Sequence, residues 1–270
     1  MTTSVDRAVE LPSVLAVSRS RAQVELKEFF RQREAVVFTV LLPVLLLTVF
    51  GAVLDYDIGS GVTFVQYFMA GIIAAGILGA SLQNMAISIA TERSDGTLKA
   101  LAGTPMPKSA FFVGKVVQVL AVTLLIIGVL LLIGVVFYGI DLPSGGEWLT
   151  FAWVTVLGAA ACTLLGIAVS SLAKNGRSAS ATVTPFALVL QFISGVFFLF
   201  SSLPQWMQTV AAIFPLKWMG QGLRSVFLPD ALAASEPAGS WELGRVALVL
   251  AAWCVVGLVL CVATFRWQDR

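Results

Sequence analysis

The chain has 270 residues, of which 58% are hydrophobic and only 12% are charged. Ordinary soluble domains are about half apolar and about one quarter charged, so this composition excludes a water-soluble globular protein. The net charge of +2, the three cysteines in apolar runs and the absence of histidine exclude a basic nucleic-acid-binding protein, a cysteine or histidine metal centre and a disulfide framework.

The first predicted element is an amphipathic helix over residues 13–33. We expect it to lie in the inner membrane interface, with its apolar face in lipid and its basic face toward anionic headgroups. A solvated helix outside any membrane is the alternative, because the amphipathic pattern is only moderate. The apolar positions are Leu15, Ala22, Leu26, Phe29 and Phe30, and the basic positions are Arg19, Arg21, Lys27, Arg31 and Arg33.

Six apolar segments follow, each long enough to cross a lipid bilayer. A helix needs about 20 apolar residues to span the hydrocarbon core. The fold class is therefore predicted to be an all-α polytopic membrane protein, with one transmembrane domain covering residues 1–270. The predicted spans are residues 35–54, 64–90, 116–140, 149–172, 178–200 and 246–265.

The distribution of lysine and arginine predicts the orientation of these spans. Cytoplasmic loops of membrane proteins are enriched in both residues. With the N-terminus inside, only Lys217, Arg224 and Arg245, of 17 lysines and arginines, fall outside. We therefore expect a multi-pass protein of the cell (inner) membrane with both termini in the cytoplasm.

The loop between the second and third spans, residues 91–115, is the most distinctive cytoplasmic segment. Charged residues end a span, a glycine permits a sharp turn, and a short helix with two leucines precedes a proline. Such a compact element suits docking to a soluble partner, because few side chains lose entropy on burial. A simple solvated loop is the alternative. The candidate residues are Glu92, Arg93, Asp95, Gly96, Thr97, Leu98, Leu101 and Pro105.

The longest predicted external segment is residues 201–245. Residues 206–214 are apolar but too few to cross the bilayer, and Pro204 and Pro215 bracket them. Because unsatisfied backbone groups cannot face lipid, short re-entrant or interfacial helices are expected here rather than a seventh span.

The predicted spans contain no Asp, Glu, Lys, Arg or His. Ion-coupled carriers and voltage sensors generally need such a group at membrane depth, so these classes are disfavoured. The Gly114-Lys115 pair lacks the other glycine of a phosphate-binding loop, so ATP hydrolysis must come from another polypeptide. Without histidine no nucleophile and base can be assembled, and we expect no catalytic residues and no enzyme activity in this chain.

A few polar side chains lie at or near membrane depth within the predicted spans. They either line a substrate path or form hydrogen bonds between helices. A path so apolar suits a hydrophobic or amphipathic molecule, since binding pockets are mostly apolar with a few polar anchors. The candidate path residues are Gln83, Asn84, Gln118, Gln191 and Ser194, with Thr123 nearby.

The run from Glu92 to Pro105 resembles the coupling loop of type-2 ATP-binding-cassette (ABC) permeases. That loop reads Glu-Arg-Glu-x-Gly-Thr-Leu-Glu, followed by Thr-Pro or Ser-Pro, and this chain departs from it at two positions, one of which is Lys99. A second segment, across the fifth predicted span and the external region, resembles the family signature. It departs from the usual residues of that signature at Ala187 and Trp218. The subgroup it resembles most is the daunorubicin-resistance-type drug exporters. The matching signature residues are Leu190, Ile193, Ser194, Val196, Leu203, Pro204, Pro215, Leu216 and Arg224.

This resemblance implies an exporter of two permease subunits, the same or related chains, and two separate ABC ATPase subunits that bind ATP and Mg. The permease itself would bind no cofactor and no metal. It would move a drug, antibiotic or lipid outward, as in multidrug export and antibiotic resistance. The alternatives are a polysaccharide or glycolipid export permease, an ATP-independent pore or carrier, and a membrane sensor or adaptor that transports nothing.

Overall fold

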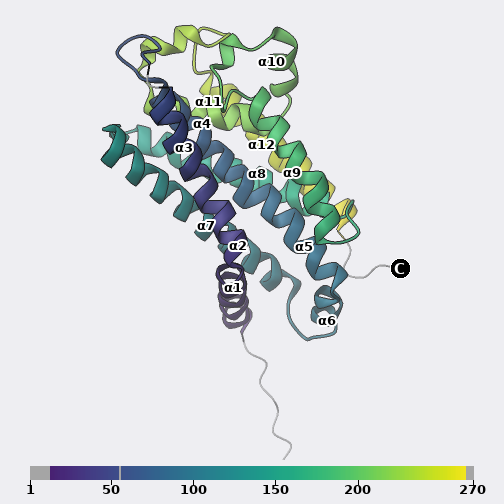
Figure 1. The fold of residues 1–270 in the computed structure, drawn as a ribbon. Helices are drawn as coiled ribbons and strands as arrows, with labels where there is room; N and C mark the ends of the chain where they lie inside the picture. The colour runs from purple at the N-terminus through teal and green to yellow at the C-terminus, as the bar shows by residue number, and fades with distance from the viewer. Residues whose placement is uncertain (1–12, 55, 266–270) are drawn as a thin grey trace, which may run out of the picture.

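The computed structural model describes residues 13–54 and 56–265, with only the backbone of Ala35. The described residues form a helical bundle (Figure 1). Arg7, Asp55, Arg266 and Arg270, which contribute to the predicted orientation, lie outside the described residues. The elements are α1 (Val14–Arg31), α2 (Arg33–Val36), the π-helix η1 (Val37–Leu41), α3 (Leu42–Val53), α4 (Phe64–Leu78), the π-helix η2 (Gly79–Gln83), α5 (Asn84–Ser94), α6 (Thr97–Ala102), α7 (Lys108–Tyr138), α8 (Glu147–Ser170), α9 (Gly176–Ile193), the 3₁₀-helix η3 (Phe200–Ser202), α10 (Gln205–Ala211), α11 (Pro215–Phe227), the 3₁₀-helix η4 (Asp230–Ser235) and α12 (Leu243–Thr264).

Four continuous helices among the described residues are long and apolar enough to cross a membrane. They are Phe64–Ser94, which joins α4, η2 and α5, together with α7, α8 and α12. These helices correspond to four of the six predicted spans. The predicted span 35–54 falls on α2, η1 and α3, whose apolar part, Val37–Val53, is shorter. The chain is thus an all-helical, multi-pass membrane protein, while six crossings stay a prediction.

The fifth predicted span, residues 178–200, is helical only as far as Ile193. Gly195 takes a left-handed conformation with φ of 72°, which is a common helix stop. The backbone N–H of Val196 then donates to the carbonyl of Gln191 over 3.3 Å. The chain therefore turns at residue 194 instead of continuing the helix to residue 200.

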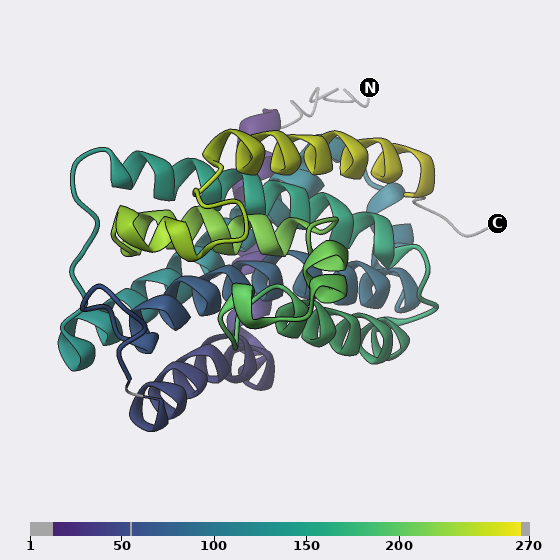
Figure 2. The same ribbon diagram turned by 90° about the horizontal axis from the view of Figure 1, so that it is seen from above.

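The centre of the bundle is α4, in which almost every side chain is buried. It packs against α3, α7, α8 and α11 (Figures 1 and 2). Phe50, Phe68 and Phe197 stack around its first turns, with ring centroids 5.0 to 6.1 Å apart. An apolar helix enclosed on all sides in this way forms the core around which the others pack.

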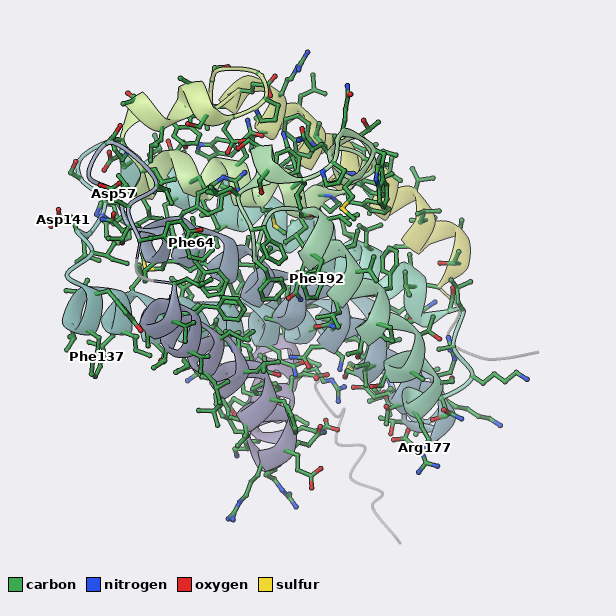
Figure 3. All side chains as sticks on the ribbon, turned by 45° about the horizontal axis from the view of Figure 1, so that its top comes forward. Asp57, Phe64, Phe137, Asp141, Arg177 and Phe192 are labelled. Carbon is green, nitrogen blue, oxygen red and sulfur yellow. The ribbon has the colours of Figure 1, made fainter. Side chains whose placement is uncertain are left out.

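The two ends of the bundle carry different loops. Figure 3 shows Asp57 and Asp141 at one end and Arg177 at the opposite end. Figure 1 shows α6 at the same end as the α8–α9 connection, and α10 at the other end. We call these the α6 end and the α10 end. Alternate loops therefore lie at opposite ends, as expected for successive crossings.

At the α10 end, α11 is buried rather than exposed. It packs against α4, α8 and α12, and most of its side chains are shielded. The sequence predicts an external re-entrant region over residues 201–245, and the structure places short helices there. One of them, α11, belongs to the bundle core.

Small residues allow several helices to approach closely. A Cβ added to Gly166 of α8 would lie 2.7 Å from the carbonyl oxygen of Leu82 and 3.0 Å from the Cβ of Met85. A Cβ on Gly158 would meet the side chain of Met219. The small residues of α8 therefore pack against this chain's own η2, α5 and α11, as expected where close packing drives helix association.

We predict that Gly166→Ala destabilises the bundle by about 1–3 kcal/mol, because the new methyl group meets backbone that cannot move aside. Gly128→Ala in α7 is the matched control, since nothing lies within 4 Å of its added Cβ. The measurement is the thermal unfolding midpoint of the purified chain in detergent. Equal midpoints for the two variants would contradict the close approach of α8 and η2.

Candidate functional site

The coupling segment, residues 92–105, forms a tight turn and one short helix at the α6 end. Gly96 has φ of 84°, a left-handed conformation that costs glycine little. The Asp95 carboxylate accepts a hydrogen bond from the backbone N–H of Thr97 over 2.9 Å, which forms an Asx-turn that leads into α6. The Thr104 hydroxyl donates to the carbonyl of Leu101 near the end of α6 over 2.7 Å. The sequence therefore specifies this turn locally.

The helix α6 is anchored through one face. Leu98 is buried against Met85, Ile89 and Phe111, in a small apolar cluster separate from the main core. Leu101 is half-buried beside it. The other face is exposed, at Lys99, Ala100, Ala102, Thr104 and Pro105. A short helix held in this way presents a fixed surface beyond the bundle.

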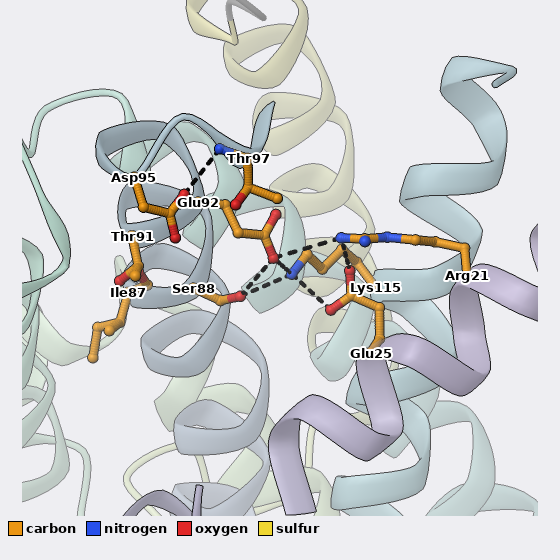
Figure 4. A network of polar contacts seen from close by, with 9 residues as sticks. All are labelled: Arg21, Glu25, Ile87, Ser88, Thr91, Glu92, Asp95, Thr97 and Lys115. Atoms are coloured by element: carbon orange, nitrogen blue, oxygen red, sulfur yellow. Dashed lines mark hydrogen bonds and ion pairs between the residues drawn. The ribbon is translucent and has the colours of Figure 1, made fainter. Parts of the chain in front are cut away.

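Buried charges connect the start of the coupling segment to two other helices (Figure 4). The Lys115 ammonium on α7 donates to Oε2 of Glu25 on α1 over 2.8 Å, and also to Oε1 of Glu92 on α5. It makes a third hydrogen bond of 2.8 Å to the Ser88 hydroxyl. Arg21 contacts Oε1 of Glu25 at 2.5 Å and Oε1 of Glu92 at 3.7 Å. We call Arg21, Glu25, Glu92 and Lys115 the charge cluster.

The charge cluster is balanced and almost fully shielded from solvent. Two positive side chains face two negative ones, and Lys115 is 1% exposed. The ring of Phe111 lies 5.4 Å from the Arg21 guanidinium and 5.5 Å from the Lys115 ammonium. Burying a charge is costly unless it is paired and hydrogen-bonded, and here each charge has an opposite partner.

Gly114 allows α1 to lie against α7 at this point. A Cβ there would be 2.8 Å from Cγ of Arg21 and 3.3 Å from Cγ of Glu25. The buried positions of α1 are Ser18, Ala22, Glu25 and Phe29, at helical spacing. Ala22 and Phe29, predicted to face lipid, and Arg21, predicted to face headgroups, point instead into the protein. That α1 lies in the membrane interface, with its other side chains in lipid or toward headgroups, stays a prediction.

Arg93 ties the coupling segment to the opposite side of the bundle. Its Nη2 donates to the carbonyl of Ser170 over 2.7 Å and also to that of Ala173. These carbonyls belong to the C-terminal end of α8 and the turn after it, where a cation is favourable. Gly176, at the start of α9, packs directly against Thr91. The adjacent residues Glu92 and Arg93 of α5 are thus held from two sides, Glu92 by α1 and α7 and Arg93 by the end of α8.

The predicted coupling residues therefore divide into two groups. Glu92, Arg93, Asp95, Gly96 and Leu98 have internal partners or shape the turn, so they hold the segment in place. The accessible surface is formed by residues 99, 100 and 102–105, including Pro105 from the predicted set, while Thr97 and Leu101 are half-buried. Reversing Glu92 and Arg93 would disturb internal contacts and would not test docking by itself. A role in coupling to an ATPase stays a prediction.

Lys115, Glu25 and Arg21 are absent from the predicted set. Each is separated from Glu92 by more than twenty residues, and no local pattern connects them. The sequence offered one signal for Lys115, which lies between two apolar runs. A charge beside a membrane span requires either water or an oppositely charged partner, so such a lysine indicates a buried ion pair. Glu25 was likewise a carboxylate on the buried side of a helical pattern.

The candidate path residues are not joined by hydrogen bonds among the described residues. Gln83 ends η2 and Asn84 begins α5, both half-buried. Gln118 is buried on α7, and Gln191 is half-buried on α9. The hydroxyl of Ser194 is buried without a partner. Their role in a substrate path stays a prediction.

Three carboxylates near the charge cluster have the spacing of metal ligands. Oxygen atoms of Glu25, Glu28 and Glu92 lie within 4.8 Å of one another. However, Lys115 and Arg21 together already neutralise two of them, Glu25 and Glu92, and Glu28 is exposed. The geometry fits an internal ion-pair cluster better than a cation site.

Comparison with known proteins gives one matching family. A model described as ABC-2 family transporter protein matches residues 56–263. The probable multidrug ABC transporter permease YbhR of Escherichia coli (strain K12) is 28% identical over 145 residues, which is 54% of this chain and only 39% of YbhR. The putative transport permease YvfS of Bacillus subtilis (strain 168) is 21% identical, over 76% of this chain and 83% of YvfS. The inner membrane transport permease YadH of Escherichia coli (strain K12) is 26% identical, over 75% of this chain and 80% of YadH.

We predict that Lys115→Met destabilises the chain by about 3–5 kcal/mol, because it leaves two buried carboxylates against one guanidinium. Lys115→Arg keeps the charge and should retain most of the stability. Lys27→Met, on the exposed face of α1, is the control and should change little. The readout is the unfolding midpoint in detergent; if Lys115→Met behaves like Lys27→Met, the charge cluster does not stabilise the fold.

Proposed function

This chain belongs to the ABC-2 family of transporter proteins, and from that premise we propose that it is the permease subunit of an ATP-driven exporter. A separate ABC ATPase, present in two copies, would supply the energy, and a second permease, the same or a related chain, would complete the complex. ATP and Mg would bind the ATPase. In this arrangement the permease catalyses nothing itself.

The observation that supports this proposal most is the geometry of the coupling segment. A motor protein can drive a membrane domain only through an element that is accessible outside the bundle and rigidly attached within it. The exposed face of α6 meets the first requirement. The buried Leu98, the charge cluster and the Arg93 contacts meet the second.

The proposed cargo is a hydrophobic or amphipathic molecule such as a drug, an antibiotic or a lipid. The described interior of the bundle is packed mainly with aliphatic and aromatic side chains. A path formed between such helices would suit apolar cargo with a few polar anchors, and it would suit a sugar polymer less well. The printed name of YbhR, a probable multidrug permease, agrees with this choice.

The proposed orientation places the α6 end and both termini in the cytoplasm. The positive-inside rule supports it, since Lys99, Lys108, Lys174 and Arg177 belong to loops of this end. At the α10 end, the connections before α4 and before α8 carry the acidic Asp57, Asp141 and Glu147.

We predict that Ala100→Trp abolishes co-purification of the ATPase and ATP-dependent export, because the indole would project from the exposed face of α6. The fold should be unaffected, since Ala100 is exposed. Ala252→Trp, on the exposed face of α12, is the matched control and should retain both properties. The measurements are ATPase recovery from membranes and transport in proteoliposomes.

Normal ATPase binding and export by Ala100→Trp would contradict docking at α6. Solute movement by the permease alone would indicate an ATP-independent pore or carrier. Ligand binding without movement, even with an ATPase present, would indicate a sensor or adaptor.

A further inference from the structure

The buried helix α11 carries polar side chains on one face. Lys217, Gln221 and Arg224 recur at intervals of four and three residues, so they share a face of the helix. All three are buried, and Arg224 is completely shielded. Charged side chains inside a membrane-protein bundle are costly and often mark functional sites.

Arg224 has spare hydrogen-bonding capacity in this buried position. Its Nε donates to Oε1 of Glu236 over 2.8 Å, and the guanidinium lies 4.9 Å from the ring centre of Tyr67. Both terminal nitrogens, Nη1 and Nη2, have no acceptor, and Oε2 of Glu236 has no donor. A guanidinium presents a planar fork of donors that matches a carboxylate or phosphate, and here most of that fork is unused.

Lys217 is the second buried cation and has no carboxylate partner among the described residues. Its ammonium reaches forward along α11 to donate to Oε1 of Gln221. It also lies 3.6 Å from the ring centre of Trp218 and 5.3 Å from that of Phe200. The bond to Gln221 directs the ammonium along α11 toward the turn that carries Arg224.

The surroundings of these cations are rigidly built. The amide of Gln221 donates to the carbonyl of Trp241 over 2.9 Å, and the indole of Trp218 donates to the carbonyl of Ala212 over 2.8 Å. The backbone N–H of Phe200 donates to the hydroxyl oxygen of Tyr67 over 2.8 Å. The connection from α11 to α12 supplies Glu236, which is 7% exposed, so the cations lie just beneath the surface.

The buried charges of this region do not balance. Among the described residues, two cations, Lys217 and Arg224, are buried here with one buried carboxylate, Glu236, which pairs with Arg224. A buried positive charge without a partner is unfavourable, and an anion would relieve it. We propose that Lys217, Gln221 and Arg224 form a binding site for the carboxylate or phosphate group of an amphipathic molecule, and that Glu236 is the internal counter-ion competing with it.

Two sources could supply that group: the molecule that the permease moves, or a lipid headgroup of the surrounding leaflet. Both offer the same chemistry, an anionic oxygen group joined to an apolar body. The anion site does not depend on the exporter assignment, because binding can be measured on the permease chain alone. Failure of one proposal therefore leaves the other standing.

The test measures binding of octyl phosphate to the full chain in a neutral detergent, with octyl glucoside as the uncharged comparison. A ligand that binds only the native state raises the unfolding midpoint. We expect stabilisation by octyl phosphate alone. Lys217→Met should weaken the affinity by about tenfold or more, the scale of one hydrogen bond to a charged group. Glu236→Gln should strengthen it, because it removes the competing carboxylate.

Arg245→Met is the control, because Arg245 lies nearby but is exposed and pairs with Glu242. It should bind octyl phosphate like the unmodified chain. Equal stabilisation by octyl phosphate and octyl glucoside would overturn the site. Unchanged affinity in both Lys217→Met and Glu236→Gln would overturn it as well, and neither variant removes the Arg224 side chain on which folding could depend.

Lipid nanodiscs distinguish the two sources. Phosphatidylglycerol added to phosphatidylcholine discs should raise the apparent Kd for octyl phosphate if a lipid headgroup occupies the site. An unchanged Kd would assign the site to the acidic group of a transported molecule. Loss of binding in both kinds of disc, despite binding in detergent, would overturn a role for the site in the membrane.

The pH dependence gives an independent check. Burial lowers the pKa of Lys217 to about 8, with Glu236 and Glu242 acting to raise it and Arg224 and Arg245 acting to lower it. The ammonium form that binds an anion is therefore lost as the pH rises through about 8. We predict that the affinity for decanoate, which stays ionised, falls between pH 7 and pH 9. Lys217→Arg should bind decanoate without this fall, and a fall of equal size in that variant would exclude Lys217 as the titrating group.

Discussion

A charge removed from water must have an opposite partner, and this requirement determines the geometry of the α6 end. Lys115 lies inside the bundle, where an unpaired ammonium would cost several kcal/mol. Its carboxylate partners come from two different helices, Glu25 of α1 and Glu92 of α5. The three helices must therefore meet at one point. The coupling segment begins beside Glu92, so its position follows from this meeting point.

The neighbouring contact of Arg93 makes the attachment two-sided. Glu92 ties the end of α5 to α1 and α7, while Arg93 ties it to the end of α8 and the turn before α9. Consequently, a load applied to α6 reaches four other helices through short polar contacts and the packing of Leu98. Packed interfaces of this kind tend to move as rigid bodies instead of deforming continuously. The local sequence shapes the turn, and the long-range contacts fix its position relative to the bundle.

The sequence predicted the features that depend on composition and local pattern. The apolar runs located the four long helices, and the glycine of the coupling segment predicted its turn. The sequence did not predict contacts between distant residues, such as Lys115 with Glu25, because hydropathy carries no information about partners ninety residues apart. It assigned Lys217 and Arg224 to an external re-entrant region, but it did not predict that both side chains are buried. The structure buries both because Gln221, Glu236 and the aromatic rings surround them. A local signal was missed at Gly195, whose left-handed conformation ends α9 early.

Buried charges are balanced at one end of the bundle and unbalanced at the other, and this difference bears on what each end does. At the α6 end, two cations meet two carboxylates, so the formal charges of the cluster cancel, even though Nε and Nη2 of Arg21 and one oxygen each of Glu25 and Glu92 have no hydrogen-bond partner among the described residues. At the α10 end, the described residues include two buried cations but one buried carboxylate, and the terminal nitrogens of Arg224 lack acceptors. A balanced cluster favours one fixed arrangement of its helices. The proposed anion would supply the missing negative charge at the α10 end, so the same electrostatic rule that favours one arrangement at the α6 end would make the α10 end receptive to a ligand.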